Sequence, residues 1–289
     1  MRLLTKGDKV GIVACSNGVS EASKEKIELL NNTLKSLELN VVMSRKIYKH
    51  KSPLNSTGKE RAEILMDFFC DDEIKAILDI SGGDLCNEIL EYLDYGIIKD
   101  NSKPFFGYSD LSVVLNALYS KTDMKTYLYQ IRNIIGEDKE EQMRNFKDTI
   151  MDEGNLLKDF SYKWIQGESM EGIVVGGNIR CLLKLAGTEY MPDFNEKILF
   201  LESFSGDVYK MTTYLTQYKH MGVFKKIKGI ILGSYTEMER ENYSPDIVEI
   251  VRNIVDNELM PIIKTNEIGH GKDSKCIVIG EKIILNKED

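Results

Sequence analysis

The stretch that decides the fold runs from residue 74 to residue 118, IKAILDISGGDLCNEILEYLDYGIIKDNSKPFFGYSDLSVVLNAL. The apolar run Ile74–Ile80 predicts a strand, and the glycine turn at residues 81–84 ends it. A helix is expected next, because Leu85, Ile89 and Leu93 recur every four residues. The pattern then repeats, with a strand over Lys103–Tyr108 and a helix marked by leucines at 111, 115 and 118.

The same alternation extends upstream, where residues 9–14 and 40–43 predict strands around a helix and residues 57–60 (TGKE) have the form of a capping box. Strands that are apolar throughout and alternate with helices indicate a parallel sheet covered by helices on both faces. The expected fold class is therefore α/β.

The length of 289 residues suggests two domains. The stretch 137–154 is charged and helical with little strand character, so we expect an N-terminal domain over 1–135, a connecting segment over 136–165 and a C-terminal domain over 166–289. The C-terminal part contains apolar runs typical of strands at 172–175, 198–201, 227–232 and 261–264, and helices near 178–186, 207–220 and 246–257. Its last two β-rich runs, Cys276–Ile279 and Lys282–Leu285, are joined by two residues and predict a hairpin.

The composition excludes several classes of function. Lys and Arg number 38 against 46 Asp and Glu, which gives a net charge of −8. A negative surface repels phosphate backbones and anionic lipids, so neither nucleic acid nor a membrane is an expected partner. The chain has no run of about 18 apolar residues that would span a membrane, and its N-terminal stretch does not resemble a secretion signal.

Cysteine and histidine usage indicates a cytoplasmic protein and gives no sign of a metal site. The five cysteines, at 15, 70, 86, 181 and 276, include no C-x-x-C pair, so we expect reduced thiols and neither disulfides nor a zinc site. With only three histidines, a His-rich metal site is hard to build. We expect no metal and no organic cofactor.

Ser109 follows a predicted strand directly and starts a helix, where an open α/β sheet places functional groups. Gly107 permits the sharp turn, and the free N–H groups of the helix start favour a developing anion. The pattern is not G-x-S-x-G, because Leu111 stands at the second glycine position. Helix capping by Ser109 or Asp110 is the simpler interpretation of this stretch taken alone.

Two further residues are candidates for acid–base chemistry. Glu202 follows the apolar run 198–201, where a carboxylate is partly desolvated and needs a partner or a function, although a solvated loop acid is the alternative. His270 lies between two glycines and has no apolar face. His50 lies in a basic loop and His220 near a helix end, where a cation suits the helix dipole, so His270 is by elimination the best general base.

The turn at residues 81–84 is either a tight connection or a source of backbone N–H groups for an oxyanion hole. The chain contains no P-loop motif, so ATP binding of that kind is not indicated. Cys15, after the first strand, could be a nucleophile paired with His270. No helix start follows it to lower its pKa, which counts against that assignment.

Together these motifs resemble the LD-carboxypeptidases and their relatives the microcin C immunity proteins, a family of serine peptidases. The resemblance covers almost the whole chain, and its specific part is Gly-Tyr-Ser-Asp at 107–110 followed by a strand-end Glu and a Gly-His. The stretches that carry it are 6–8 (KGD), 61–66 (RAEILM), 74–77 (IKAI), 81–83 (SGG), 93–95 (LDY), 106–111 (FGYSDL), 176–178 (GGN), 198–202 (ILFLE) and 269–270 (GH).

The resemblance implies a triad in which Ser109 is the nucleophile, His270 the general base and Glu202 the residue that orients it. It implies an oxyanion hole formed by the backbone N–H groups of Asp110 and Gly83. It also implies a parallel-sheet α/β domain carrying the serine, a β-rich α/β domain carrying the other two, and an active site at their interface. A homodimer is implied by the resemblance alone.

Two substrate classes remain open at this point. One is a murein tetrapeptide that loses its terminal D-Ala, and the other is the amide that joins an aminoacyl group to a nucleotide-like antibiotic. Trp164, the only tryptophan, lies in the connecting segment and is either a hydrophobic plug between the domains or a stacking surface for a nucleobase. Outside the enzymes, the alternative is a cytosolic small-molecule binding protein with a two-lobed α/β cleft.

Overall fold

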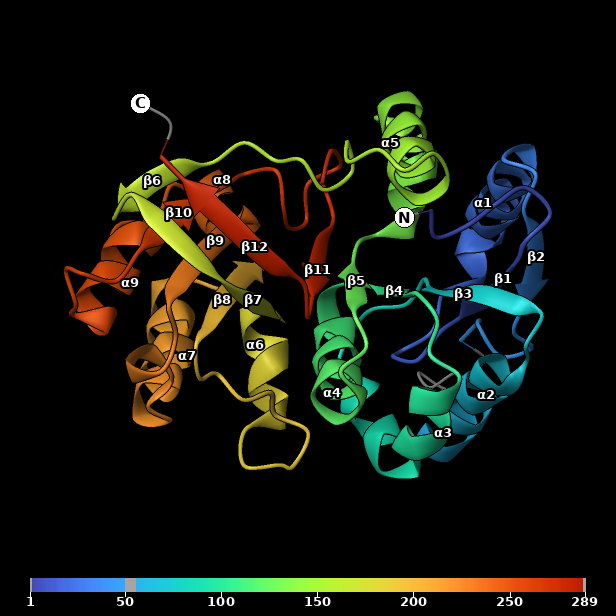
Figure 1. Cartoon of the computed structure of the whole chain (residues 1–289), viewed down its shortest axis with the longest axis horizontal. Coiled ribbons are helices and arrows are strands. Elements are labelled where there is room, and N and C mark those ends of the chain that lie inside the picture. The colour runs from blue at the N-terminus through green and yellow to red at the C-terminus, as the bar shows by residue number, and fades with distance from the viewer. Residues whose placement is uncertain (1, 50–55, 288–289) are drawn as a thin grey trace.

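The computed structural model describes residues 2–49 and 56–287 and consists of two lobes, each built on a six-stranded sheet (Figure 1). Both sheets are mainly parallel and are covered by helices, so the expected two-domain α/β class is confirmed. None of the described helices combines the length and the apolar character that a membrane span requires.

The N-terminal sheet has the strand order β11-β5-β4-β3-β1-β2, in which only β11 is antiparallel to its neighbour. Parallel strands place their carboxyl ends at one edge, so the loops after β1, β3 and β4 meet there. The strands of this sheet are β1 (Lys9–Val13), β2 (Asn40–Met43), β3 (Ile74–Asp79), β4 (Phe105–Gly107), β5 (Thr126–Leu128) and β11 (Ile277–Ile279).

The helices of this lobe are α1 (Lys24–Ser36), α2 (Gly58–Cys70), α3 (Tyr95–Asp100), α4 (Ser112–Thr122) and α5 (Lys139–Phe146). The expected capping box forms, because Thr57 and Glu60 bond reciprocally to each other's backbone N–H. The helix predicted after the residue 81–84 turn is instead a 3-10 helix, Cys86–Tyr92. Leu93 is extended and the side chain of Asp94 caps α3, so the chain restarts a helix there.

The C-terminal sheet has the order β12-β7-β8-β9-β10-β6, with four parallel strands between two antiparallel edges. Its strands are β6 (Lys163–Gln166), β7 (Ser169–Asn178), β8 (Lys197–Ser203), β9 (Gly229–Tyr235), β10 (Ile262–Lys264) and β12 (Lys282–Asn286). Its helices are α6 (Ile179–Leu182), α7 (Val208–His220), α8 (Thr236–Arg240) and α9 (Ile247–Val255).

The predicted C-terminal hairpin is wrong. β11 pairs with β5 in the N-terminal sheet, whereas β12 pairs with β7 in the C-terminal sheet. The two-residue link between them is tied to β7 instead, because the Gly280 N–H donates to Val174 O at 2.8 Å and the Val174 N–H donates to Glu281 O at 2.9 Å. The C-terminal part of the chain thereby joins both sheets.

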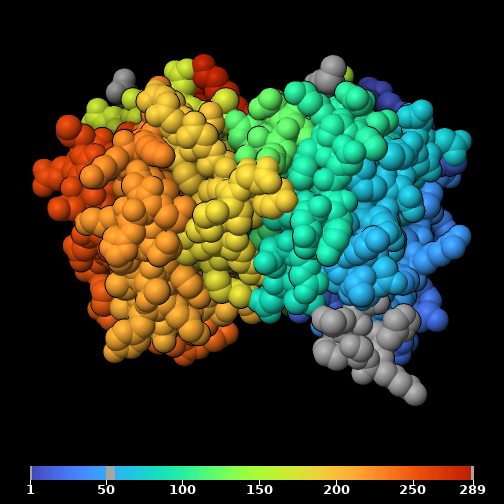
Figure 2. Space-filling model, turned by 90° about the horizontal axis from the view of Figure 1, so that it is seen from below, coloured from blue at the N-terminus to red at the C-terminus, as the bar shows by residue number. Residues whose placement is uncertain are grey.

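The lobes also contact each other on the face shown in Figure 2, where the loop after α6 (yellow) lies against α3 and α4 (green to cyan). The rings of Tyr95 and Tyr190 lie 5.8 Å apart across this contact, and Lys121 forms an ion pair with Glu189. Aromatic and charged groups therefore both bridge the two lobes.

Candidate active site

Ser109 lies at a sharp turn between β4 and α4. β4 ends at Gly107, Tyr108 is extended, and Ser109 has a φ of 56°, the left-handed conformation that non-glycine residues seldom adopt. A Cβ added at Gly107 would lie 2.7 Å from the Leu111 Cβ, so the turn requires glycine there. Strained serines of this kind are typical of nucleophiles exposed at the end of a strand.

The structure brings Ser109, His270 and Glu202 together, although 161 residues separate the serine from the histidine. His270 Nε2 lies 3.2 Å from Ser109 Oγ, and His270 Nδ1 lies 2.6 Å from Glu202 Oε2. Glu202 is fully buried near the end of β8, and His270 lies in the loop between β10 and β11. One imidazole therefore connects a hydroxyl of the N-terminal lobe to a buried carboxylate of the C-terminal lobe.

Neighbours from both lobes hold this carboxylate and the loop that carries the imidazole. The Asn178 side chain donates to Glu202 Oε1 at 3.0 Å, and the Asn178 N–H donates to Ser112 Oγ at 2.8 Å. The Tyr108 hydroxyl donates to Gly269 O at 2.8 Å. Burial, reinforced by Glu202, raises the pKa of Tyr108 well above its usual value, so the phenol keeps the proton that this bond needs.

Asp110, next to the serine, is a fully buried carboxylate with three donors. Ser16 Oγ donates to it at 2.6 Å, the Cys86 N–H at 2.9 Å and Lys184 Nζ at 2.5 Å. Lys184 comes from the C-terminal lobe and also donates to Asp84 O at 2.7 Å. A cation of one lobe thus bonds to both the Ser109 turn and the glycine turn of the other.

The glycine turn after β3 depends on Gly83, whose φ is 129°. A Cβ there would lie 2.2 Å from the Asn17 side chain, so only glycine fits. Asn17 Oδ1 accepts from the N–H groups of Asp84 at 2.9 Å and Leu85 at 3.2 Å, whereas the Gly83 N–H has no hydrogen-bond partner within the described residues. This N–H is free to bind an external oxygen, as an oxyanion donor must be.

Ser109 and His270 line a cleft of about 630 Å³. Ser81 and Gly82, which belong to the glycine turn, form one wall, and Phe204 forms another, with its ring 4.9 Å from the imidazole. The cleft also contains Arg132, and no Asp or Glu side chain belongs to its lining in the part of the chain that the structure describes. The cleft therefore has a hydroxyl–imidazole pair, an aromatic surface and a positive charge.

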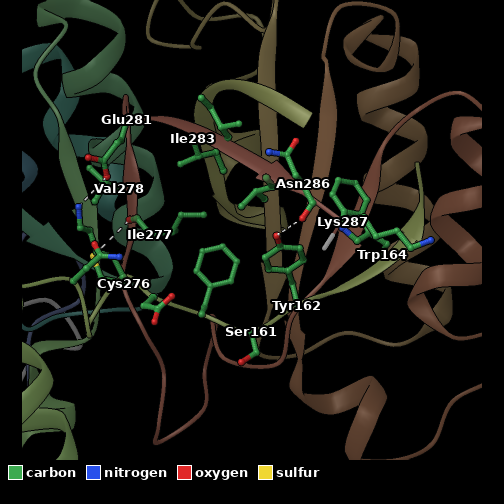
Figure 3. A pocket seen from close by; sticks show the side chains of 16 residues that line it. Ser161, Tyr162, Trp164, Cys276, Ile277, Val278, Glu281, Ile283, Asn286 and Lys287 are labelled. Carbon is green, nitrogen blue, oxygen red and sulfur yellow. Dashed lines mark hydrogen bonds and ion pairs between the residues drawn. The ribbon is translucent and has the colours of Figure 1, made fainter. Parts of the chain in front are cut away.

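Trp164 does not lie in this cleft. It is on β6, edge-on to Tyr162 at 6.1 Å, and lines a separate cavity between the lobes that Figure 3 shows. Half-buried against the apolar core, it matches the alternative of a hydrophobic plug, and the expected stacking role has no geometric support.

The other candidates also lie away from Ser109. Cys15 is buried, and burial raises the pKa of its thiol well above the usual value, which disfavours a thiolate nucleophile. His220 is the last residue of α7, as expected of a residue at a helix end. His50 lies outside the described residues.

The sequence reasoning missed three residues of this site. Phe204 and Arg132 line the cleft, and Lys184 bonds to Asp110, next to Ser109. The only signal for Phe204 was its position two residues after the strand-end glutamate. Nothing in the local pattern distinguished Arg132 or Lys184 from surface cations.

Comparison with known proteins agrees with this geometry over both lobes. Residues 10–129 match the LD-carboxypeptidase N-terminal domain, and residues 171–285 match the LD-carboxypeptidase C-terminal domain. A probable murein peptide carboxypeptidase of Bacillus subtilis is 27% identical over 99% of this chain and 91% of its own length. The microcin C7 self-immunity protein MccF of Escherichia coli is 23% identical over 98% of this chain and 92% of its own length.

Solved structures show the same fold. An MccF-like protein from Bacillus anthracis is 28% identical, with a TM-score of 0.85 over 99% of this chain and 95% of that one. MccF in complex with aspartyl sulfamoyl adenosine is 22% identical, with a TM-score of 0.88 over 98% of this chain and 94% of that one.

Proposed function

The chain belongs to the LD-carboxypeptidase family, and we propose that it is a serine-type peptidase that cleaves an amide bond by acyl transfer. The observation that carries the proposal is the pair of contacts made by one histidine: Nε2 to Ser109 Oγ at 3.2 Å and Nδ1 to Glu202 Oε2 at 2.6 Å. A binding protein without activity has no need for this chain of donors and acceptors. The geometry therefore favours the enzyme over the two-lobed binding protein.

In the proposed reaction Ser109 Oγ attacks the substrate carbonyl while His270 Nε2 takes its proton. Glu202 accepts the Nδ1 hydrogen bond, which fixes the tautomer and stabilises the imidazolium. The N–H groups of Asp110 and Gly83 receive the oxyanion of the tetrahedral intermediate. His270 then protonates the leaving amine, and water releases the acyl group by the same steps in reverse.

The proposed substrate is a murein tetrapeptide, from which the enzyme removes the terminal D-Ala. Support comes from the relatives named as murein carboxypeptidases, which align over nearly the whole chain. A second candidate is an aminoacyl-nucleotide amide of the microcin type. Two observations favour it: the fold matches MccF in complex with aspartyl sulfamoyl adenosine, and Phe204 offers an exposed ring beside the imidazole for stacking.

The proposed setting is the cytoplasm, with the protein acting as a homodimer. The support is in the sequence, whose five widely spaced cysteines include no C-x-x-C pair, a usage typical of reduced thiols in a cytosol. The dimer rests on the family resemblance and is tested by the mass of the protein in solution.

The proposed function is tested by giving the native protein each substrate and identifying the products by mass spectrometry. Release of D-Ala from the tetrapeptide supports the murein reaction, and release of the amino acid from aspartyl sulfamoyl adenosine supports the nucleotide reaction. If the protein binds either compound but turns over neither, the two-lobed binding protein is the correct alternative.

A further inference from the structure

Arg132 is a cation inside the cleft that forms no ion pair with a carboxylate of the described residues. It lies in the 3-10 helix Ile131–Ile135, which follows β5, and is half-buried in the cleft wall. Among the described residues its guanidinium has one hydrogen-bond partner, Gln130 Oε1, which accepts from Nε at 3.2 Å. Its two terminal nitrogens form no bond to the described chain.

The buried carboxylate of Asp79 acts on the charge of Arg132 but forms no hydrogen bond or ion pair with it. Asp79 is fully buried and already accepts from the Cys15 N–H at 2.7 Å and from the Ser81 N–H and hydroxyl at 2.7 Å and 2.6 Å. Burial lowers the pKa of Arg132, but a guanidinium stays charged at neutral pH. A half-buried charge without a partner is costly unless a ligand completes its bonds.

The surroundings favour an anionic ligand. The protein has a net charge of −8, yet the cleft is lined by two cations, Arg132 and Lys26, and by no Asp or Glu within the described residues. Lys26 is exposed on α1 at the rim, whereas Arg132 lies deeper, beside Gln130 and Asn133. The two free terminal nitrogens present the planar fork that binds two oxygens of one anion.

We propose that Arg132 binds the anionic group of the substrate, by two hydrogen bonds to a carboxylate at the end of a peptide or to the sulfamoyl or phosphoryl group of a nucleotide conjugate. This inference rests on the proposed function and deepens it. It makes the enzyme selective for substrates that carry a negative charge near the scissile amide. Neutral peptides then lack the contact that orients the amide toward Ser109.

The test compares a murein tetrapeptide with the same peptide whose C-terminus is a carboxamide. For the native protein we expect kcat/KM to be about 10- to 100-fold higher for the free acid, as for a charge-assisted bond. Arg132→Gln should lower kcat/KM for the acid by that factor and leave the carboxamide within about twofold, so that the preference disappears. Arg132→Lys keeps the charge without the fork and should be intermediate.

Arg144→Gln is the matched control, because it removes the same charge from α5, outside the cleft. It should leave both substrates unchanged. Equal losses on acid and carboxamide in Arg132→Gln, with the native melting temperature, would overturn the inference. Full retention of the acid preference together with unchanged hydrolysis of aspartyl sulfamoyl adenosine would overturn it as well. Aspartyl sulfamoyl adenosine distinguishes the source of the anion: a loss on it alone assigns the sulfamoyl group.

A binding measurement tests the anion site even if the proposed peptidase activity is absent. If the native protein hydrolyses none of these compounds, binding of the acid and the carboxamide is measured by calorimetry in the Ser109→Ala protein with and without Arg132→Gln. An acid preference that requires Arg132 supports the anion site even then. The inference is overturned if the peptide shows no acid preference and Arg132→Gln also leaves the binding of aspartyl sulfamoyl adenosine unchanged.

Discussion

Glu202 is fully buried, and its Oε2 lies 2.6 Å from Nδ1 of His270. Its other oxygen accepts from the Asn178 side chain at 3.0 Å, so both carboxylate oxygens have a donor. A buried carboxylate bonded in this way holds the imidazole with its proton on Nδ1 and leaves Nε2 to accept a proton from Ser109.

Glu202→Gln should therefore lower kcat by about 10²- to 10⁴-fold with little change in fold. The amide can donate to Nδ1, which favours the tautomer with its proton on Nε2 and blocks proton transfer from the serine. Steady-state kinetics, with circular dichroism to check folding, measures the effect. Glu171→Gln on β7, an exposed residue paired with Lys282, is the control and should behave as native. A Glu202→Gln enzyme with native kcat would exclude the orienting role.

Lys184→Met should destabilise the protein and slow the reaction together. It leaves the fully buried Asp110 carboxylate without its cation, and breaking a largely buried pair costs about 3 kcal/mol. Urea unfolding gives the free energy of unfolding. Lys121→Met removes another ion pair between the lobes, with the exposed Glu189, and should cost about 1 kcal/mol or less. If both variants lose a similar free energy of unfolding, the Lys184–Asp110 ion pair stabilises the protein no more than an exposed pair does.

Thiol labelling separates the serine mechanism from a cysteine mechanism. Cys70 is exposed and the other four cysteines are buried, and burial raises the thiol pKa of all four. A raised pKa keeps these thiols protonated and unreactive at pH 8, so a thiol reagent should modify about one group per native chain and leave activity intact. Peptide mapping should place the label on Cys70. Labelling of Cys15 with loss of activity would instead indicate a cysteine nucleophile.

Phe204→Ala should weaken hydrolysis of aspartyl sulfamoyl adenosine by about 10- to 100-fold in kcat/KM, because base stacking contributes about 1–3 kcal/mol. The murein tetrapeptide, which has no base, should lose much less. Trp164→Ala should affect both substrates equally, since Trp164 lies on β6 and outside the cleft. If Trp164→Ala instead selectively weakens hydrolysis of aspartyl sulfamoyl adenosine, Trp164 and not Phe204 is the residue that stacks on the base.

The strand ends explain how much of the site could be predicted. Ser109 comes two residues after the end of β4, and Glu202 lies near the end of β8 in the other sheet. Functional groups gather at strand ends in α/β sheets, so the local pattern made each residue a candidate without placing the two together. His270 required elimination among three histidines. The family resemblance joined the three into one proposed triad, because residues 161 positions apart share no local signal.

Pairing between distant segments is what the sequence could not specify. β11 and β12 have the β-rich composition and the short link of a hairpin, but their partners are strands of different lobes. The roles of Arg132 and Lys184 depend on where the fold places them. Arg132 lies in the cleft without an ion pair to the described residues, and Lys184 lies against the buried carboxylate of Asp110. Both are ordinary cations in the sequence.

The central claim is that Ser109 is the nucleophile, and turnover by Ser109→Ala tests it most directly. The native protein and the variant are given the murein tetrapeptide and aspartyl sulfamoyl adenosine, and product formation is followed by mass spectrometry. We predict that turnover of the hydrolysed substrate falls by at least about 10³-fold while the circular dichroism spectrum and melting temperature stay native. A well-folded Ser109→Ala protein that keeps most of its activity would contradict the claim.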